Sequence, residues 1–479
     1  SCQGIFHGFR EKGKNAWNIC GSGDDEEQSN WGTPAQDARK GLIGRFNYDY
    51  KGKYLAEFSF RYDGSLKFHP DRRWGFFPSV SLGWRLSEEA FMKKFSNLDN
   101  LKVRGSYGIL GNDAVGGWQW LTNYSFGNAY IFNQAPIKSI VSGGIPNVDL
   151  TWEKTATFNF GVDASIYKGL LAVEADVFYK RTYDILGSRN ASMPQTFGAT
   201  LPSENYGIVK VKGFELQVKH DNKIGDFRYH VGGNVSWSRN KVIEKDYAAG
   251  AEPWNIPVGK TMGYRACFVA LGLFQSDEEA AAWPRFKGTQ PTAGDVKYAD
   301  LNNDGIMDER DKKVVSPYSN TPEIMFGLNL SASWKGFDFS ALFQGAANRN
   351  VMLSGFATQM FINGASNLPK YLYEDHWTPD NRDACYPKAW GPDHPSNNKS
   401  STFWLINGNY VRLKNVELGY SISKDLLSRV GVDRLRIYVG GSNLFSIDHM
   451  PGYDPEKQDG GPNYYPQQRV FNMGVNITF

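Results

Sequence analysis

One short stretch of the sequence carries oxygen-bearing side chains at the spacing of a twelve-residue calcium loop. The stretch is DLNNDGIMDERD, residues 300–311. Calcium prefers carboxylate, amide and carbonyl oxygens, and a glycine at the sixth position permits the sharp turn that such a loop makes. The candidate ligands at positions one, three, five, seven, nine and twelve are Asp300, Asn302, Asp304, Ile306 through its carbonyl, Asp308 and Asp311.

Position twelve of this loop departs from the usual pattern. Asp311 is one methylene shorter than the glutamate that normally binds calcium there through both oxygens, so its reach is reduced. The alternative interpretation is a turn rich in Asp, Asn and Gly that is held by its own side chains. We expect the 300–311 loop to bind a structural Ca²⁺ that braces the longer 274–321 segment and takes no part in catalysis.

A second group of residues could bind a substrate through flat aromatic rings. Trp118, Trp120 and Tyr124 lie close together in the segment 111–135. Aromatic rings pack well against the C–H faces of sugars and also against the side chains of peptides. A belt of aromatic residues at a membrane surface would place rings in the same region, which is the structural alternative.

Enzymatic chemistry is not indicated by the sequence. It contains no G-x-S-x-G, no H-E-x-x-H and no P-loop, and its seven histidines are scattered without ligand-like spacing. The net charge of +3 is too small to suggest binding to nucleic acid. We therefore expect a protein that is not an enzyme and has no organic cofactor or nucleic-acid partner.

The elements that must position these residues show a period of two. In FNMGVNITF, residues 471–479, apolar residues alternate with Asn, Gly and Thr, and the segment 323–334 behaves in the same way. Such a strand has one apolar face and one polar face. Aromatic residues make up 15% of the chain, and no run of about 18 apolar residues exists, so a membrane-spanning helix is excluded. The pattern predicts an all-β fold, namely a transmembrane antiparallel β-barrel around an aqueous lumen.

The alternating runs predict about fourteen strands, and loops that are long at one end of the barrel only. Short turns such as 51–52, 168–169 and 335–336 join some pairs, whereas long polar segments join others. We expect residues 1–39 to be an extracellular loop segment and residues 40–479 to be the barrel. The predicted strands lie near 40–50, 53–63, 75–86, 101–110, 154–167, 170–185, 206–220, 226–240, 262–273, 323–334, 336–346, 410–422, 434–444 and 467–479.

The four cysteines are too few for a disulfide scaffold. Cys2 and Cys20 share the N-terminal segment and form the plausible disulfide pair, with free thiols as the alternative. Cys267 and Cys385 lie far apart in the sequence.

Several stretches taken together resemble one family. They include KGLIGRFNYDYKGKYLAEFSFRYDGS (40–65), WGFFPSVSLGWRLSEEAFMK (74–93), DVKYADLNNDGIMDERD (295–311), NYVRLKNVELGYSIS (409–423) and RLRIYVGGSNLFSIDHMPGYDP (434–455). The chain resembles the C-terminal part of the barrel of a SusC/RagA-family TonB-dependent outer-membrane transporter of Bacteroidota. The resemblance implies a 22-stranded barrel that holds a plug, of which the fourteen strands would be the second part. The final strand, ending in Phe479, resembles the signal read by the barrel-assembly machinery, and the signal peptide, TonB box and plug would precede residue 1.

The resemblance also implies a function and partners. It predicts active import of nutrient oligomers, with oligosaccharides or glycans preferred, across the cell outer membrane of a Gram-negative bacterium. A SusD-like surface lipoprotein would act as a lid, the TonB complex would act through the missing N-terminal part, and lipid would surround the barrel. The aromatic rings of segments 111–151, 274–321 and 347–408 would pack against the lid, or against one another. An oligopeptide importer of the same family, and a non-gated porin or adhesin, are the alternatives.

Overall fold

The computed structural model describes most of the chain. The described residues are 37–132, 135–199, 201–361, 368–390, 396–423, 427, 431–457, 459–460 and 467–479. The predicted loop segment 1–39 therefore lies almost entirely outside the described residues, as does the predicted Cys2–Cys20 pair.

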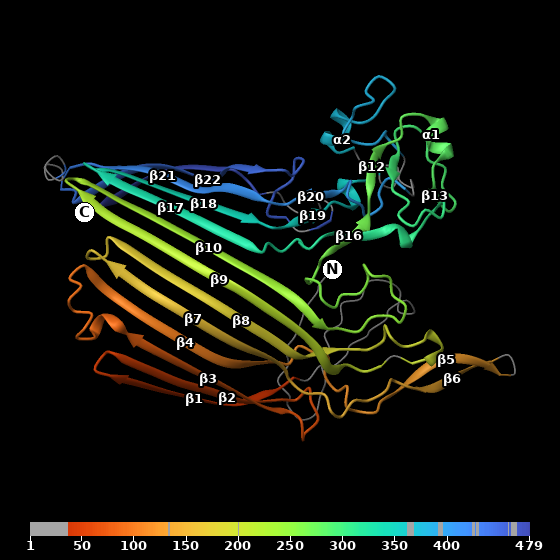
Figure 1. The fold of residues 1–479 in the computed structure, drawn as a ribbon, viewed down its shortest axis with the longest axis horizontal. Helices are drawn as coiled ribbons and strands as arrows, with labels where there is room; N and C mark the ends of the chain where they lie inside the picture. Colours follow the sequence, from red (N-terminus) through yellow and green to blue (C-terminus); the bar gives the residue numbers. More distant parts are fainter. Residues whose placement is uncertain are drawn as a thin grey trace, which may run out of the picture.

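One antiparallel sheet of thirteen strands dominates the described structure. Figure 1 shows these strands running side by side between two ends of the molecule. Each strand pairs with the next one along the sheet, so the connectivity is that of successive hairpins. In sheet order the strands are β1 (Arg39–Tyr50), β2 (Tyr54–Ser65), β3 (Trp74–Arg85), β4 (Leu98–Asn112), β7 (Glu153–Ile166), β8 (Leu171–Gly187), β9 (Glu204–Ile224), β10 (Phe227–Glu244), β17 (Ile324–Trp334), β18 (Phe337–Ala347), β21 (Tyr410–Ser421), β22 (Arg434–Asp448) and β23 (Val470–Thr478).

The remaining elements are short, and most lie in the long connections at one end of the sheet (Figure 1). They form five two-stranded sheets and a few helical turns. No helix in the described residues has the length and hydropathy needed to cross a bilayer. The strands are β5 (Tyr124–Phe132), β6 (Ala135–Ser142), β11 (Arg265–Phe268), β12 (Ala270–Leu273), β13 (Arg285–Phe286), β14 (Val296–Tyr298), β15 (Ile306–Met307), β16 (Lys312–Ser316), β19 (Asn350–Met352) and β20 (Leu405–Asn407). The helices are α1 (Asp277–Ala282), α2 (Lys370–Glu374), η1 (Leu86–Glu88), η2 (Gln195–Phe197), η3 (Glu309–Asp311) and η4 (Gly355–Ala357).

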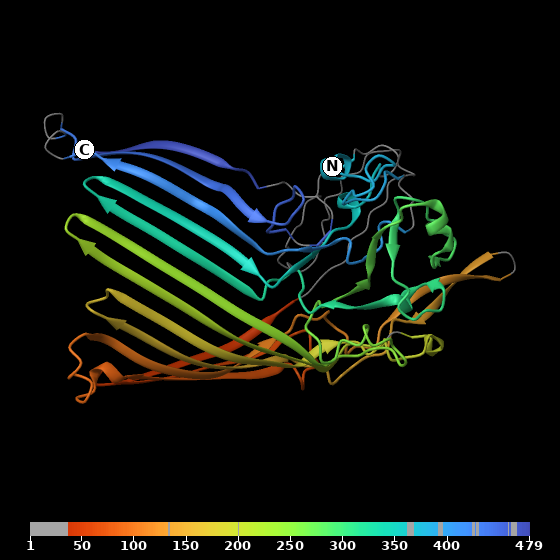
Figure 2. The ribbon, with the colours of Figure 1, turned by 45° about the horizontal axis from the view of Figure 1, so that its top comes forward.

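Short turns close the hairpins at the opposite end. Between β17 and β18 the turn has two residues, Lys335 and Gly336, and both have positive φ, of 45° and 91°. This backbone is typical of the tight hairpin turns that match the twist of the strands. Figure 2 shows that the sheet curves into a trough whose two edge strands are β1 and β23. The predicted arrangement of short turns at one end and long loops at the other is confirmed.

The two faces of the sheet differ in chemistry, as the alternation predicts. On β23, Phe471 and Met473 lie on one face and are 76% and 85% exposed, so no other part of the described chain covers that face. We call it the apolar face. Asn472 and Asn476 lie on the other face, where Asn476 is the register partner of Arg436. We call this second face the polar face.

The predicted strand 262–273 is wrong, because this segment does not join the main sheet. It forms β11 and β12, which pair with β16 and β14 in the loop region. Cys267 and Phe268 are both buried, so consecutive residues are covered by protein, whereas a barrel strand would expose alternate residues. Gly272, with a φ of 123°, interrupts the run.

The long loops have hydrophobic cores of their own. One buried cluster joins loop strand β19 to the segments around Trp390 and Trp404, and a second joins Phe268 to Tyr298. The buried guanidinium of Arg349 donates from Nε to the Asn320 carbonyl at 3.1 Å and from Nη2 to the Lys457 carbonyl at 2.5 Å. The loops are therefore packed against one another, and they form what we call the loop assembly.

Candidate functional site

Ion pairs cover the polar face of the sheet. Arg104 on β4 reaches past β7 to Asp176 on β8, with Nη2 and Oδ2 2.5 Å apart, and its Nε lies 3.1 Å from Asp163 on β7. Arg436 on β22 makes the equivalent bridge to Asp338 and Glu417, on β18 and β21. These two arginine side chains extend over neighbouring strands and are partly shielded from solvent. A charge in such a position is costly unless an oppositely charged group lies close to it. The polar face therefore carries paired charges, and such a surface is suited to contact with water or a polar solute.

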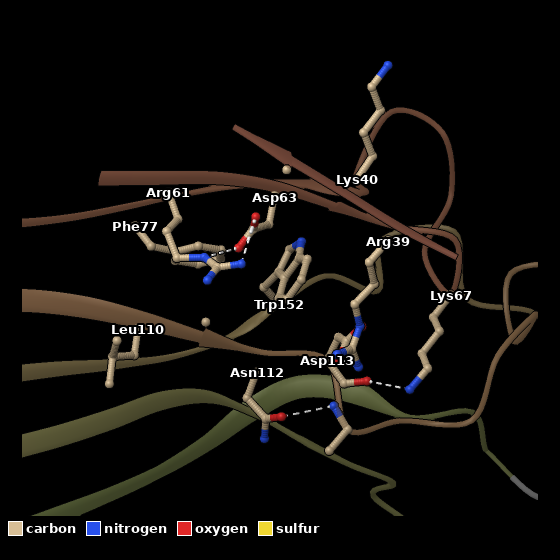
Figure 3. A pocket seen from close by; sticks show the side chains of 13 residues that line it. Arg39, Lys40, Arg61, Asp63, Lys67, Phe77, Leu110, Asn112, Asp113 and Trp152 are labelled. Atoms are coloured by element: carbon tan, nitrogen blue, oxygen red, sulfur yellow. Dashed lines mark hydrogen bonds and ion pairs between the residues drawn. The ribbon is translucent and has the colours of Figure 1, made fainter. Parts of the chain in front are cut away.

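A cavity of about 630 Å³ lies between β1, β2, β3 and β4 at the long-loop end of the sheet. Figure 3 shows its contents: Arg61 and Asp63 face one another, and the rings of Phe77 and Trp152 lie nearby. Arg61 Nε donates to Asp63 Oδ2 at 2.9 Å. Arg61 and Asp63 share a face of β2 with Glu57, which is paired with Arg45, so they lie on the polar face. We call this cavity the rim cavity.

Asp113 holds one side of the rim cavity together. Its carboxylate is 4% exposed and accepts hydrogen bonds from Arg39 Nε at 2.9 Å, Arg39 Nη2 at 2.5 Å and Ser65 Oγ at 2.7 Å. Lys67 Nζ donates to the backbone carbonyl of Asp113 at 3.0 Å. Charge-assisted bonds of this kind are strong when shielded from water, so they fix the loop after β4 against the ends of β1 and β2. No local sequence pattern indicates these residues, because Arg39 and Asp113 are 74 residues apart.

Two of the predicted substrate residues lie beside the rim cavity. The rings of Trp118 and Trp120 are 5.9 Å apart, and Trp120 meets the edge of His69 at 5.3 Å. Lys67 lines the rim cavity and lies two residues before His69. Gly117, next to Trp118, faces the Lys67 side chain, because a Cβ atom at Gly117 would lie 3.9 Å from Lys67 Cγ. The pair of tryptophans therefore lies close to a wall of the rim cavity.

The tryptophan segment is held in place by its polar neighbour. Trp118 has a φ of 65°, which is uncommon for a bulky residue. The neighbouring Gln119 accepts two hydrogen bonds. The Ser203 amide donates to Gln119 Oε1 at 3.1 Å, and the Asn147 amide donates to the Gln119 carbonyl at 2.9 Å. These bonds compensate for an unfavourable backbone conformation and present Trp118 to solvent.

The third predicted substrate residue is separate. Tyr124 begins strand β5 and is highly exposed. In the described structure its ring makes no aromatic contact with Trp118 or Trp120, which contact each other and His69. The structure thus brings two of the three predicted aromatics together, and Tyr124 belongs to the β5–β6 hairpin instead.

The 300–311 loop makes the sharp turn that its sequence predicts. Gly305 has a φ of 82°, and the Gly305 amide donates to Asp300 Oδ2 at 2.9 Å. Asn302 Oδ1 accepts from the Asp304 amide at 3.1 Å, and Asp304 Oδ1 accepts from the Ile306 amide at 3.0 Å. Asp311 is buried and accepts from the backbone amides of two other residues of the loop.

Arg310 neutralises part of this loop. Its Nη2 lies 2.5 Å from Asp304 Oδ2 and 2.8 Å from Asp308 Oδ2. The hydrogen bond from the Arg310 side chain lowers the pKa of the Asp308 carboxyl below its usual range. Within the described residues, no three His, Cys, Asp or Glu side chains converge as metal ligands. The calcium site therefore stays a prediction, and it would require Arg310 to move away from Asp304.

The aromatic rings of the long loops pack largely among themselves. Trp377 and Trp390 are buried, and the Trp283 Nε1 donates to the Tyr298 carbonyl at 2.8 Å. Self-packing, the alternative considered from the sequence, therefore accounts for several of the rings. Other rings remain exposed, among them Trp118, Tyr124, Phe126, Phe132, Phe356, Phe361 and Tyr373.

Comparison with known proteins shows which family the chain belongs to. A family model described as the TonB dependent receptor-like β-barrel matches residues 6–444. The chain belongs to this family. Its members are outer-membrane proteins, so the apolar face meets lipid, the polar face lines the lumen, and the loop assembly is extracellular.

Named relatives of this TonB-dependent receptor-like chain come from two bacteria. TonB-dependent receptor P26 of Formosa agariphila is 29% identical over 91% of this chain and 46% of its own length. TonB-dependent receptor SusC of Bacteroides thetaiotaomicron is 26% identical over 91% of this chain and 43% of its own length. The chain thus spans about half the length of these relatives.

The same fold occurs in a solved transporter. A chain of the RagAB peptide importer, in its open-open state, superimposes with a TM-score of 0.74 at 23% identity. The match covers 93% of this chain and 47% of that one. The predicted fold, a large antiparallel sheet of the TonB-dependent β-barrel type, is confirmed by this likeness and by the family model.

Proposed function

We propose that the full-length protein imports nutrient oligomers across the outer membrane in a TonB-dependent manner. The rim cavity carries the proposal, because it lies on the lumen face next to the loops and has both apolar rings and paired charges. Binding sites combine an apolar lining with a few placed polar groups in this way. A substrate arriving from outside would meet the exposed Trp118 before it reached Arg61 and Asp63.

Oligosaccharides are the substrate class that we favour. A flat indole beside a polar cavity suits a sugar ring, which offers C–H groups on its faces and hydroxyls at its edge. The hydroxyls can donate to Asp63 and accept from Arg61 while these two keep their charges balanced. Oligopeptides are the second candidate, and the likeness of the fold to the RagAB peptide importer favours them.

Two partners complete the proposal. A SusD-like lipoprotein would cover the loop assembly, and Phe356, Phe361 and Tyr373 are among the exposed rings available for such a contact. TonB would supply the energy for import by the full-length transporter. Extraction of the native protein in mild detergent tests the lid, because a barrel that purifies without a stoichiometric lipoprotein would contradict it.

Substrate binding can be tested on the purified full-length transporter with defined glycan and peptide pools. Replacing Trp118 and Trp120 by alanine should weaken binding of the recognised oligomer about tenfold, which corresponds to a stacking contact of about 1.4 kcal/mol. Trp74→Ala is the matched control, because Trp74 is exposed on the apolar face at the same end of the sheet. Equal binding by the double variant and the control would contradict the proposed site, and retention of peptides alone would select the second candidate.

We also propose that the 300–311 loop binds Ca²⁺ as a structural ion. The tight turn at Gly305 supports this proposal, because its amide donates to Asp300 Oδ2 at 2.9 Å and Asn302 Nδ2 donates to Asp304 Oδ2 at 3.0 Å. Calcium would then replace the Arg310 guanidinium as the positive charge at Asp304. The ion would hold the β14–β16 segment against the rest of the loop assembly.

A further inference from the structure

Basic side chains gather on the apolar face of β8, β9 and β10, at the long-loop end. The register of these strands arranges the outward residues in rows. Val177, Phe214 and Trp237 form an apolar row. The next row towards the loops is Tyr179, Lys212 and Arg239, and the one after it is Arg181, Lys210 and Lys241. We call Arg181, Lys210, Lys212, Arg239 and Lys241 the basic patch.

The change from apolar to basic is abrupt. Rows two residues apart on a strand are separated by about 7 Å along it. Towards the short turns, the rows beyond Phe214 continue with Leu216 and Val218 on β9, which face the same way. The basic patch therefore lies just outside an apolar band that meets the acyl chains of the bilayer, at the depth of the outer-leaflet headgroups.

Most charges of the basic patch lack an acidic partner among the residues that the structure describes. Arg239 is paired with Glu323, with Nε and Oε1 2.7 Å apart. In the described part of the chain, Lys210, Lys212 and Lys241 make no ion pair with a carboxylate. Lys212, Lys241 and Arg181 are exposed, while Lys210 is half-buried.

Charged side chains of the neighbouring segments are already paired with residues outside the basic patch. Arg189 lies between the carboxylates of Glu204 and Glu244, and Asp184 is paired with Lys154 at 3.2 Å. Lys260 donates to the Pro253 carbonyl at 2.5 Å. These acidic side chains therefore already have cationic partners, and the basic patch keeps an excess of positive charge.

A cavity of about 580 Å³ adjoins this excess charge. It is lined by Tyr179, Lys210, Lys212, Arg239, Lys241, Lys260 and Tyr264, among others. It is bounded on one side by the sheet and on the other by the loop residues around Lys260 and Pro317. It therefore offers several ammonium donors and one guanidinium at the edge of the lipid.

We propose that the basic patch binds the phosphate of a phosphorylated, acylated glycolipid of the outer leaflet, the chemical class of lipopolysaccharide. The phosphate oxygens accept hydrogen bonds from Lys210, Lys212 and Lys241, and the acyl chains lie along the apolar row of Val177 and Phe214. Charge complementarity favours this occupant, because the patch faces lipid and lies on the opposite side of the wall from the lumen. The inference does not depend on the identity of the imported substrate.

The test is the amount of phosphorylated lipid that stays bound to the full-length transporter after mild detergent extraction, measured by native mass spectrometry. Lys210→Gln, Lys212→Gln and Lys241→Gln are combined in one variant, which should retain at least about tenfold less lipid, since each basic residue contributes to binding at an anionic surface. The matched control combines Lys102→Gln, Lys180→Gln and Lys223→Gln on the polar face. Heat-modifiability on gels confirms that both variants are folded. Equal lipid retention by the two variants would overturn the proposal.

Two added ligands distinguish the chemistry of the contact. The same lipid without its phosphate should bind the unaltered protein as weakly as the phosphorylated lipid binds the triple variant. If the dephosphorylated lipid binds equally well, the contact is with acyl chains and the proposal is wrong. Inorganic phosphate alone should compete only weakly, and full displacement of lipid by it at equal concentration would show a soluble-anion site instead.

Discussion

Replacing Trp404 by alanine should open the loop assembly and leave the sheet folded. Trp404 is 1% exposed, its ring centroid lies 4.9 Å from that of Phe403, and its Nε1 donates to the Asn397 carbonyl at 2.7 Å. Truncation of a buried tryptophan costs about 3–5 kcal/mol, and the unpaired Asn397 carbonyl adds about 1 kcal/mol or more. Because the core around Trp404 consists of loop residues, the loss should fall on the loop assembly.

Limited proteolysis of the protein in native membranes measures this effect. If cleavage follows the population of the opened loop, a loss of 3 kcal/mol should raise its rate on the order of 100-fold in Trp404→Ala. Trp404→Phe keeps an aromatic ring in the core and should raise the rate far less. Trp334→Ala is the control for a tryptophan that faces lipid, since Trp334 is half-exposed at the short-turn end.

Two results would refute this reasoning. Cleavage of Trp404→Ala at the rate of Trp404→Phe would show that the ring does not hold the loops together. Loss of the heat-modifiable barrel at the same time as loop cleavage would show that the sheet and the loop assembly unfold as one unit.

Two further predictions concern the loops. Asp300→Ala combined with Asp304→Ala should abolish calcium binding measured by calorimetry. Arg310→Ala should tighten calcium binding, because a competing cation is removed. If titration of calcium into the unaltered protein releases no heat of binding, the loop is only a turn. Burial raises the pKa of the Cys267 thiol to about 11, so at pH 8 almost none is thiolate, and a maleimide should label the exposed Cys385 but not Cys267 until the loops unfold. Equal labelling of both thiols in a variant without Cys2 and Cys20, read by mass spectrometry, would contradict the packing of β11.

The sequence alone determined the strands of the main sheet and their two faces. In a strand the side chains alternate with a period of two, so the pattern of residues 471–479 shows both where the strand lies and which residues meet lipid. The turn at Gly305 was also predictable, because Asp300, Asn302 and Asp304 bond to backbone amides only a few residues away. These are local properties, and local sequence carries them.

Tertiary structure decided which strands pair and which distant groups meet. The segment 262–273 is apolar enough for a strand, but its partners β14 and β16 could not be read from its own residues. Arg39 and Asp113 are 74 residues apart, and no spacing rule connects them. The basic patch likewise exists only because the register of β8, β9 and β10 aligns Arg181, Lys210 and Lys241. Such sites depend on through-space distance, which is set by pairing and packing of the whole sheet and not by separation along the chain.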